Sequence, residues 1–201
     1  MVLTTATAIL TTSCGGSKHE KTINNLKAAI EGETGASAKY KAFSIRAEEE
    51  GFHNISRMFA AASEAETIHV RTHNSVLEKL GQPTHHPTPE TPVVSTTLEN
   101  LMAAIEGETY EFEVMYPGFI ADAHAENREE AVRTFEWAKG AEMTHARFYS
   151  KALEILKATG SDATISSAWF VCPKCGDLFD SAEDLNRCPL CGVNPSMFLK
   201  F

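Results

Sequence analysis

Long apolar runs and basic side chains are both scarce in this sequence of 201 residues. No apolar run approaches the roughly 20 residues that a helix needs to cross a bilayer, so we expect no membrane-spanning segment. Lys and Arg number 18 against 27 Asp and Glu, and the resulting net charge of −9 argues against a nucleic-acid partner. Cysteine is sparse too: there are five, four of them within residues 172–191, which is unlike a disulfide scaffold.

What is present is the composition of an ordinary globular protein. Hydrophobic residues make up 43% of the chain and charged residues 22%, which excludes a disordered or collagen-like protein. The length suits one medium-sized domain followed by a small one.

The first residues differ in composition from the rest. Residues 1–13 carry no charged side chain and are rich in Thr and Ala, and they lead into Cys14. We expect residues 1–16 to be an N-terminal extension of a cytoplasmic protein. The alternative is an export signal with Cys14 as the lipid-carrying residue, although no basic segment precedes the apolar stretch and Leu10 lies four residues before the cysteine rather than three.

The body of the chain contains an internal repeat. The seven residues 28–34 recur letter for letter as residues 103–109, an offset of 75, and Glu66-x-x-His69 recurs as Glu142-x-x-His145, an offset of 76. Between the two halves, residues 81–97 begin with Gly and contain four prolines, so we expect a connector rather than a helix.

Each half of the repeat is predicted to form two long helices. Apolar residues step by three and four over 23–40 and 55–80 in the first half, with a break near Gly51. The second half shows the same stepping over 98–119 and 131–156, with a turn near Glu126. Four such helices with one long crossover predict a ferritin-like four-helix bundle over residues 17–160.

Several acidic residues and histidines occupy positions in the apolar faces of these helices. An unpaired buried carboxylate costs several kcal/mol, so these residues need partners. At about 1.5 Å per residue, their distances from the two turns place them at one level of the bundle. One Glu from each of two helices and Glu-x-x-His from each of the other two is the ligand set of a di-iron or di-manganese site. We therefore expect a two-metal site formed by Glu33, Glu66, His69, Glu108, Glu142 and His145, with Glu111 at its edge.

The C-terminal residues 161–201 carry a second metal-binding pattern. Two Cys-x-x-Cys-Gly sequences stand twelve residues apart and supply Cys172, Cys175, Cys188 and Cys191. Four thiolates suit either iron or zinc. We expect residues 159–168 to be a linker and the aromatic residues of this region, Trp169, Phe170, Phe179, Phe198 and Phe201, to form a small separate core.

The combination of these two patterns over residues 17–201 resembles the rubrerythrin family. The resemblance implies a mainly α protein: a ferritin-like bundle followed by a rubredoxin-like domain of short β-strands and metal-binding knuckles. It implies two iron ions on Glu33, Glu66, Glu108, Glu111, Glu142 and His145, with His69 exchanging with Glu111. It also implies catalytic roles for Glu111, His69, Tyr40 and Tyr116, and one iron on the four cysteines. His73, one turn past His69, is expected to pack beside the site.

The function implied by the resemblance is a peroxidase that reduces hydrogen peroxide to water. The implied partners are an external electron-donor reductase or rubredoxin and a second copy of the chain, in a head-to-tail or helix-swapped homodimer. We expect the two kinds of metal site to be far apart within one chain, and the resemblance implies that in such a dimer the module of one copy lies near the di-iron site of the other. The alternatives are a ferroxidase or other iron-handling protein, and a non-enzymatic protein with a zinc ribbon at its end.

Overall fold

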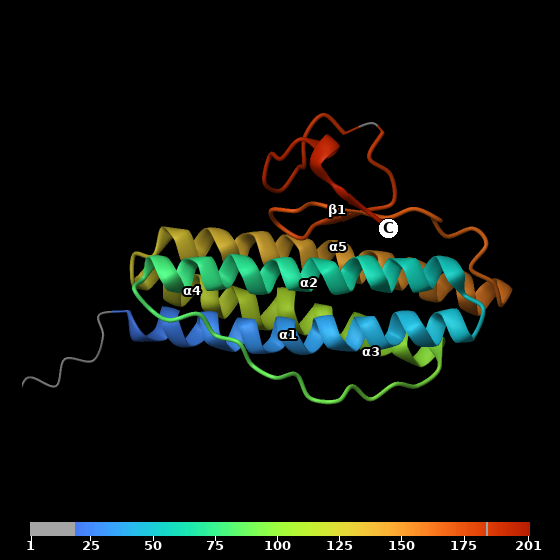
Figure 1. The fold of residues 1–201 in the computed structure, drawn as a ribbon, viewed down its shortest axis with the longest axis horizontal. Helices are drawn as coiled ribbons and strands as arrows, with labels where there is room; N and C mark the ends of the chain where they lie inside the picture. Colours follow the sequence, from blue (N-terminus) through green and yellow to red (C-terminus); the bar gives the residue numbers. More distant parts are fainter. Residues whose placement is uncertain (1–18, 184) are drawn as a thin grey trace, which may run out of the picture.

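The computed structural model describes residues 19–183 and 185–201, and its main body is a bundle of long helices (Figure 1). The expected N-terminal extension and Cys14 lie outside the described residues. The helical elements are α1 (Glu20–Glu49), α2 (His53–Lys79), α3 (Thr97–Tyr110), the π-helical segment η1 (Glu111–Met115), α4 (Tyr116–Ala125) and α5 (Glu129–Thr159). Because α3, η1 and α4 run on as one rod, the predicted ferritin-like four-helix bundle is confirmed.

Two tight turns end the helices at the predicted places. Gly51 follows α1 with a φ of 83°, in the left-handed region that glycine adopts at little cost. In the second half, Asn127 between α4 and α5 has a φ of 57°. Asparagine tolerates this conformation better than most residues, which explains a turn without glycine.

The core of the bundle has two parts, one on each side of the acidic residues. One part contains the aromatic side chains of Tyr40, Phe43, Phe59 and Tyr149. The other contains Leu26, Ile30, Leu77, Tyr116 and Phe135. The carboxylates therefore lie between two apolar layers, far from either end of the bundle.

The connector between the halves runs along the outside of the bundle beside α1 (Figure 1). Near its start it is attached to α2, because Asn74 Nδ2 donates to the carbonyl of His85 at 3.0 Å and Asn74 Oδ1 accepts from its amide at 2.7 Å. Its end is fixed by a capping box in which the Thr96 hydroxyl accepts from the Glu99 amide while the Glu99 carboxylate accepts from the Thr96 amide.

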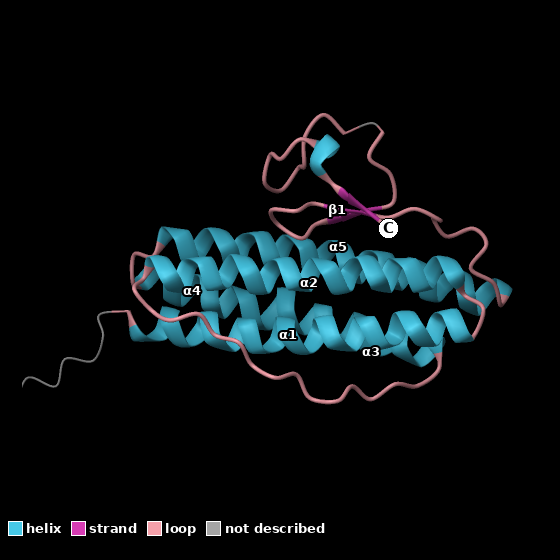
Figure 2. Ribbon diagram, viewed as in Figure 1, coloured by secondary structure: helices cyan, strands magenta, loops and turns pink. Residues whose placement is uncertain are grey.

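The C-terminal cysteine module lies on the opposite side of the bundle from the connector, over α2 and α5 (Figure 1). Its three short strands are β1 (Phe170–Val171), β2 (Leu178–Phe179) and β3 (Leu199–Lys200), which form an antiparallel sheet in the order β2-β1-β3 (Figure 2). A 3-10 turn, η2 (Pro195–Met197), precedes β3. The predicted short strands are confirmed.

The segment between α5 and the module is not the free linker that we expected over residues 159–168. Helix α5 continues to Thr159, and the Asp162 carboxylate then accepts hydrogen bonds from the amides of Asn54 and Ile55 at 2.7 and 3.2 Å, capping α2. Trp169 and Phe201 were expected in the core of the module, but both pack against the core of the bundle, where the Trp169 ring lies 4.9 Å from that of Phe148. Apolar burial against the larger core explains both differences.

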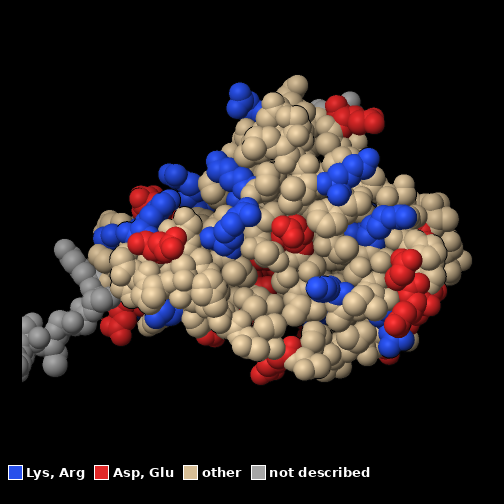
Figure 3. Space-filling view, in the orientation of Figure 1, with Lys and Arg blue, Asp and Glu red and all other residues tan. Residues whose placement is uncertain are grey.

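None of the helices in residues 19–183 and 185–201 is both long enough and apolar enough to cross a membrane. On the face seen in Figure 3, acidic and basic side chains are interspersed over the bundle.

Candidate metal centres

The bundle brings the predicted acidic residues and histidines to one place in its interior. They come from all four rods: Glu33 from α1, Glu66 and His69 from α2, Glu108 from α3, and Glu142 and His145 from α5. All six are at most 1% exposed to solvent. The prediction that these six residues lie at one level of the bundle is therefore confirmed.

Their ligand atoms form two groups that share two residues. One group contains Glu33, Glu66, His69 and Glu142, and the other contains Glu66, Glu108, Glu142 and His145; within each group the atoms lie within 4.8 Å of one another. Because Glu66 and Glu142 belong to both groups, each can bind one ion with each of its two oxygens. This is the arrangement of a carboxylate-bridged two-metal site.

Distances to the histidine rings follow the same pattern. His69 Nδ1 lies 2.9 Å from Glu66 Oε2 and 3.0 Å from Glu142 Oε1. His145 Nδ1 lies 2.9 Å from the other oxygen of Glu142, Oε2, and 3.3 Å from Glu66 Oε1. Each ring therefore directs its Nδ1 toward one group.

The buried atoms that point into this site fit metal ions. The short contacts between these atoms do not have the angles of hydrogen bonds: among the described residues, both oxygens of Glu66 and Glu142, one oxygen each of Glu33 and Glu108, and Nδ1 of both histidines have no hydrogen-bond partner. Buried polar atoms without partners destabilise a fold by about 1–3 kcal/mol each. A pair of divalent cations would satisfy all of them at once, and the mixed oxygen and nitrogen donors suit iron or manganese.

Without metal, the carboxylates of the site have displaced pKa values. Burial, reinforced by the charge of Glu142, raises the pKa of Glu33 to about 8, and burial together with Glu66 raises the pKa of Glu108 to about 7. Burial would also raise the pKa of Glu66, but the contacts with His145 and His69 lower it to about 2. In the absence of metal, protons on Glu33 and Glu108 thus neutralise part of the negative charge that metal ions would otherwise neutralise.

Glu111 lies beside the two groups but outside both. It begins the π-helical segment η1, and its carboxylate Oε1 would lie 3.9 Å from a Cβ added at Gly32 of α1. Burial and the neighbouring carboxylates, Glu33 first among them, raise its pKa well above the ordinary value, which favours the protonated form of this side chain.

The π-helical segment explains a feature of the repeat. Glu33 and Glu108 differ by 75 residues, whereas the two tyrosines that follow them, Tyr40 and Tyr116, differ by 76. One residue has therefore been inserted between Glu108 and Tyr116, where η1 lies, as expected for a π-bulge. Sequence analysis found both offsets of the repeat but did not predict the bulge; the change of offset was its signal.

The two tyrosines hold carboxylates from the opposite half of the repeat. The hydroxyl of Tyr40 donates to Glu108 Oε1 at 2.8 Å, and the hydroxyl of Tyr116 donates to Glu33 Oε1. Both phenols are fully buried. They therefore fix the orientation of one carboxylate in each group.

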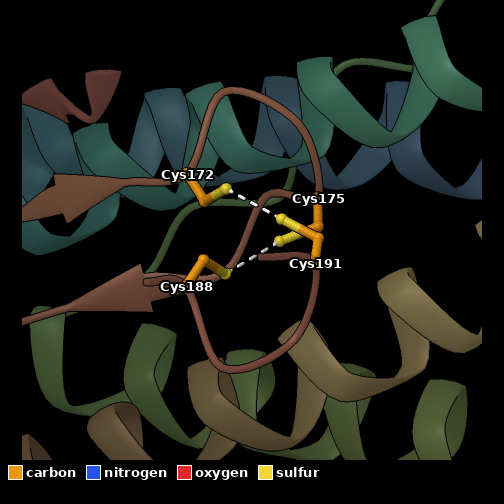
Figure 4. A group of neighbouring side chains, drawn as sticks. All are labelled: Cys172, Cys175, Cys188 and Cys191. Carbon is orange, nitrogen blue, oxygen red and sulfur yellow. Dashed lines mark hydrogen bonds between the residues drawn. The ribbon is translucent and has the colours of Figure 1, made fainter. Parts of the chain in front are cut away.

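The four clustered cysteines form the second candidate centre. Figure 4 shows Cys172 and Cys175 on one loop and Cys188 and Cys191 on the facing loop, with their sulfurs turned toward one another. The sulfurs of Cys172 and Cys191 are 3.3 Å apart and those of Cys175 and Cys188 are 3.6 Å apart, and none of the four forms a disulfide. A tetrahedral ion with bonds of about 2.3 Å to sulfur needs sulfur separations of about 3.8 Å, so the cage needs little change to bind one.

The thiols are also prepared for metal binding. Hydrogen bonds from Cys175 and Cys188 lower the pKa of Cys172 to about 4, which favours the thiolate that binds metals. The same contacts raise the pKa of Cys175, because a proton that leaves one thiol of the group is held by another.

The two candidate centres are adjacent in one chain, which corrects the expectation that they are far apart. His69 Nε2 lies 3.0 Å from the carbonyl oxygen of Cys175, and His145 Nε2 lies 3.3 Å from that of Gly176. Each ring can donate from Nε2 to the module while Nδ1 faces the carboxylates. Such an outer hydrogen bond fixes the tautomer of a metal-binding histidine.

Gly176 permits this contact. Its φ is 77°, and a Cβ at this position would overlap His69 Nε2. On the neighbouring rod, a Cβ at Gly140 of α5 would lie 2.7 Å from Leu190 of the second knuckle. Sequence analysis missed both contacts; the glycine that follows each Cys-x-x-Cys pair indicated the turn but not its neighbour.

Known proteins share this architecture. The family model for rubrerythrin matches residues 24–153. Nigerythrin from Nitratidesulfovibrio vulgaris is 39% identical over 170 residues, which cover 85% of this chain and 81% of that protein. Rubrerythrin-2 from Clostridium acetobutylicum is 32% identical over 184 residues, covering 92% and 98%.

Solved structures agree with these matches. A structure of fully reduced, all-ferrous nigerythrin superposes with a TM-score of 0.82 at 36% identity and covers 96% of this chain and 90% of that one. A bacterioferritin from Desulfovibrio desulfuricans, with a TM-score of 0.68 at 15% identity over 76% and 95% of the two chains, shares the fold alone. On the family match and the extent of the relatives, the chain belongs to the rubrerythrin family.

Proposed function

We propose that this protein is a peroxidase that reduces hydrogen peroxide to water, with iron in both candidate centres. The observation that carries the proposal is the seating of the cysteine module on His69 and His145, the two histidines of the bundle site. A protein that only stores iron needs no second metal site in hydrogen-bond contact with the first. The membership of the family and the similarity to an all-ferrous nigerythrin structure support iron as the metal.

The reaction requires both electrons and protons. Reduction of one H2O2 breaks the O–O bond and consumes two electrons and two protons to give two water molecules. Iron bound in the bundle would supply the two electrons, and iron bound by the cysteines would replace them one at a time. The protein must therefore connect the two sites and deliver protons.

The connection between the sites is short. From Cys175 Sγ it follows the side chain and backbone of that residue to its carbonyl oxygen, crosses 3.0 Å to His69 Nε2, and continues through the ring to Nδ1. A second connection runs from the carbonyl of Gly176 to the ring of His145. The two sites are thus connected through covalent bonds and hydrogen bonds rather than across empty space.

Glu111 is the best placed proton donor on this chain. Burial raises the pKa of its carboxyl group, which lies beside the ligands and is the one acidic group of the cluster that is not fully buried among the described residues. It can donate a hydrogen bond, and then a proton, to an oxygen of bound peroxide. The exchange of Glu111 with His69 implied by the resemblance is part of the proposal, because Glu111 lies outside both ligand groups in this structure.

Tyr40 and Tyr116 have a positioning role in this scheme. Their hydroxyl protons are engaged by Glu108 and Glu33, so they hold the two carboxylates rather than a substrate. An external reductase or rubredoxin as electron donor, and a homodimer as the assembled form, complete the proposal.

Rapid mixing of the reduced, iron-loaded protein with either H2O2 or O2 tests this function. We expect peroxide to oxidise the bundle site faster than O2 does, and Glu111→Ala to slow that step by about 100-fold. Cys175→Ser is expected to preserve the first oxidation but to block re-reduction by an external donor. Faster oxidation by O2 would favour the ferroxidase alternative, and zinc in the cysteine site would favour the non-enzymatic one.

A further inference from the structure

A line of polar side chains leads from the carboxylate cluster toward the surface between α2 and α5. It starts at Tyr116, whose hydroxyl contacts Glu33. His73 Nε2 lies 3.2 Å from the Tyr116 oxygen, and His73 Nδ1 lies 3.0 Å from Thr134 Oγ1. Thr134 Oγ1 in turn lies 3.2 Å from Thr72 Oγ1. Each neighbouring pair is within hydrogen-bond distance.

The outer end of this line reaches a cavity of about 150 Å³. Thr72 and Thr134 line the cavity, and Lys79, Glu130 and Arg133 at its rim are exposed to solvent. A water molecule occupies about 30 Å³ in the liquid, so the cavity has room for a few. Water in the cavity would therefore lie against Thr72 and Thr134, whereas none of the carboxylates of the bundle site lines the cavity.

The other half of the repeat provides an internal comparison. At an offset of 76 residues, the counterpart of Tyr116 is Tyr40, which also donates to a carboxylate. Beyond it the polar line is absent from the described part of the chain, because the hydroxyl of Tyr149, the counterpart of His73, has no hydrogen-bond partner. The counterparts of Thr72 and Thr134 carry no hydroxyl: they are Phe148 and Met58. Apolar side chains can therefore fill the positions that Thr72 and Thr134 occupy. The polar side chains between α2 and α5 must have a role other than packing.

We propose that His73 relays protons from the water-accessible cavity at Thr72 and Thr134 to Tyr116 and so to the carboxylate cluster. The inference rests on the proposed function, because peroxide reduction consumes two protons at a site where four carboxylates are fully buried, those of Glu33, Glu66, Glu108 and Glu142. In each step a proton passes from Thr134 to His73 Nδ1, the Nε2 proton passes to the Tyr116 oxygen, and the Tyr116 proton passes to Glu33. Water in the cavity restores the proton of Thr134. The transfer leaves the ring proton on Nδ1, so the ring and the hydroxyl groups must return to their starting orientation, with the proton again on Nε2, before a second proton passes.

Both forms of the neutral ring occur in the relay. Before a transfer the proton is on Nε2, and His73 donates to Tyr116, which donates to Glu33, and accepts from Thr134. After a transfer the proton is on Nδ1, and His73 donates to Thr134, which donates to Thr72, while Nε2 accepts from the Tyr116 hydroxyl because the former Tyr116 proton is on Glu33. Burial, assisted by the charge of His69, lowers the pKa of His73 to about 3, so the ring keeps one donor and one acceptor at neutral pH.

Thr134→Val tests the relay because it replaces a hydroxyl by a methyl group of similar size. The first measurement is solvent exchange of the His73 ring N–H, followed by ¹⁵N NMR in the metal-free full-length protein. We expect exchange to be at least tenfold slower in Thr134→Val than in the wild type, and to recover in Thr134→Ser, which keeps the hydroxyl. Tyr149→Phe, which removes the unpartnered hydroxyl on the other side, is the matched control and should exchange like the wild type.

The second measurement is the rate of peroxide-driven oxidation of the iron-loaded protein in H2O and D2O. We expect Thr134→Val and His73→Phe to lower this rate by about tenfold and to increase the solvent isotope effect, with metal content unchanged. Unchanged ring exchange in Thr134→Val would overturn the relay. If the wild type does not react with peroxide, the proposed function fails, while the NMR measurement still decides whether His73 exchanges protons through Thr134.

Discussion

At the residue scale, the bundle site is defined by side chains whose polar atoms have no adequate partner within the protein. Glu66 and Glu142 each present two oxygens without hydrogen bonds to the described residues, one toward each ligand group. Glu33 and Glu108 belong to one group each. Two of the four carboxylates are thus shared between the ligand groups and two are not, and each half of the repeat contributes one shared and one unshared carboxylate.

This inequality predicts different effects of removing a shared and an unshared carboxylate. Glu66→Ala removes a ligand from both groups, so we expect it to weaken the binding of both ions by at least tenfold, whereas Glu33→Ala should weaken one. Anaerobic titration with Fe(II) counts the ions bound. Glu31→Ala, an exposed neighbour on α1, should bind like the wild type. Equal losses in the two ligand variants would contradict the shared arrangement.

Metal binding is also expected to release protons in a pH-dependent manner. The metal-free pKa values of Glu33 and Glu108, about 8 and about 7, lie above the ordinary value, so both groups are protonated at pH 6 and must lose their protons to bind an ion. In spite of burial, the neighbouring carboxylates also raise the pKa values of His69 and His145 well above the ordinary value, so these rings too must lose a proton to bind an ion. Affinity should therefore rise from pH 6 to pH 8 and continue to rise above it. Calorimetry in buffers of different ionisation enthalpy measures the protons released, and equal release at pH 6 and pH 9 would contradict the raised pKa values.

At the scale of secondary structure, two local features adjust a regular bundle to its site. The π-helical segment η1 inserts one residue after Glu108, and it begins at Glu111, whose counterpart in the first half is Ala36. The first knuckle of the cysteine module uses Gly176 to bring backbone carbonyls to the histidines. In both cases an irregular backbone conformation places a group at the site, the Glu111 side chain in η1 and the backbone carbonyls beside Gly176, where a regular helix or strand would not.

The two knuckle glycines provide a test of the docking. Gly176 and Gly192 have φ values of 77° and 78°, so an alanine at either position costs about 1–2 kcal/mol of backbone strain. Only the Cβ at Gly176 meets the bundle; at Gly192 it meets no atom of the described residues within 4 Å. We expect Gly176→Ala to displace the module and increase the radius of gyration in solution scattering, and Gly192→Ala to leave it unchanged. Equal values for both variants would count against the docking.

At the scale of the whole molecule, the connector and the cysteine module cover opposite sides of the bundle (Figure 1). Asp162 and Trp169, in the segment between α5 and β1, attach the module to the bundle. The first knuckle of the module then contacts His69 of the same chain. Electron transfer between the two sites is therefore expected within one chain rather than between the two copies of a head-to-tail or swapped dimer.

Mixing two inactive variants distinguishes transfer within a chain from transfer between chains. Cys175→Ser lacks the cysteine site and Glu66→Ala is impaired in the bundle site, so each should lose donor-dependent peroxide turnover. If electrons pass within one chain, co-expression of the two variants should not restore turnover. Restored turnover would show that one copy's module serves the bundle site of another, as in a head-to-tail or swapped dimer.

The sequence by itself determined the helices, the turns between them, the residues of both ligand sets and their common level in the bundle. It could do so because helical periodicity and the exact repeat of Glu and Glu-x-x-His are local patterns that burial makes costly to violate. The connector follows equally from local composition, whereas the short strands of the cysteine module were expected only from the resemblance to a known family.

Only the tertiary structure decided which carboxylates are shared, where Glu111 lies, and that the cysteine module rests on His69 and His145. It also placed Trp169 in the core of the bundle and joined His73 to Thr134. These features depend on contacts between residues far apart in the chain, and no local pattern encodes which surfaces meet. The docking of the module is the clearest case, because it depends on a missing side chain at Gly176 whose neighbour belongs to another element.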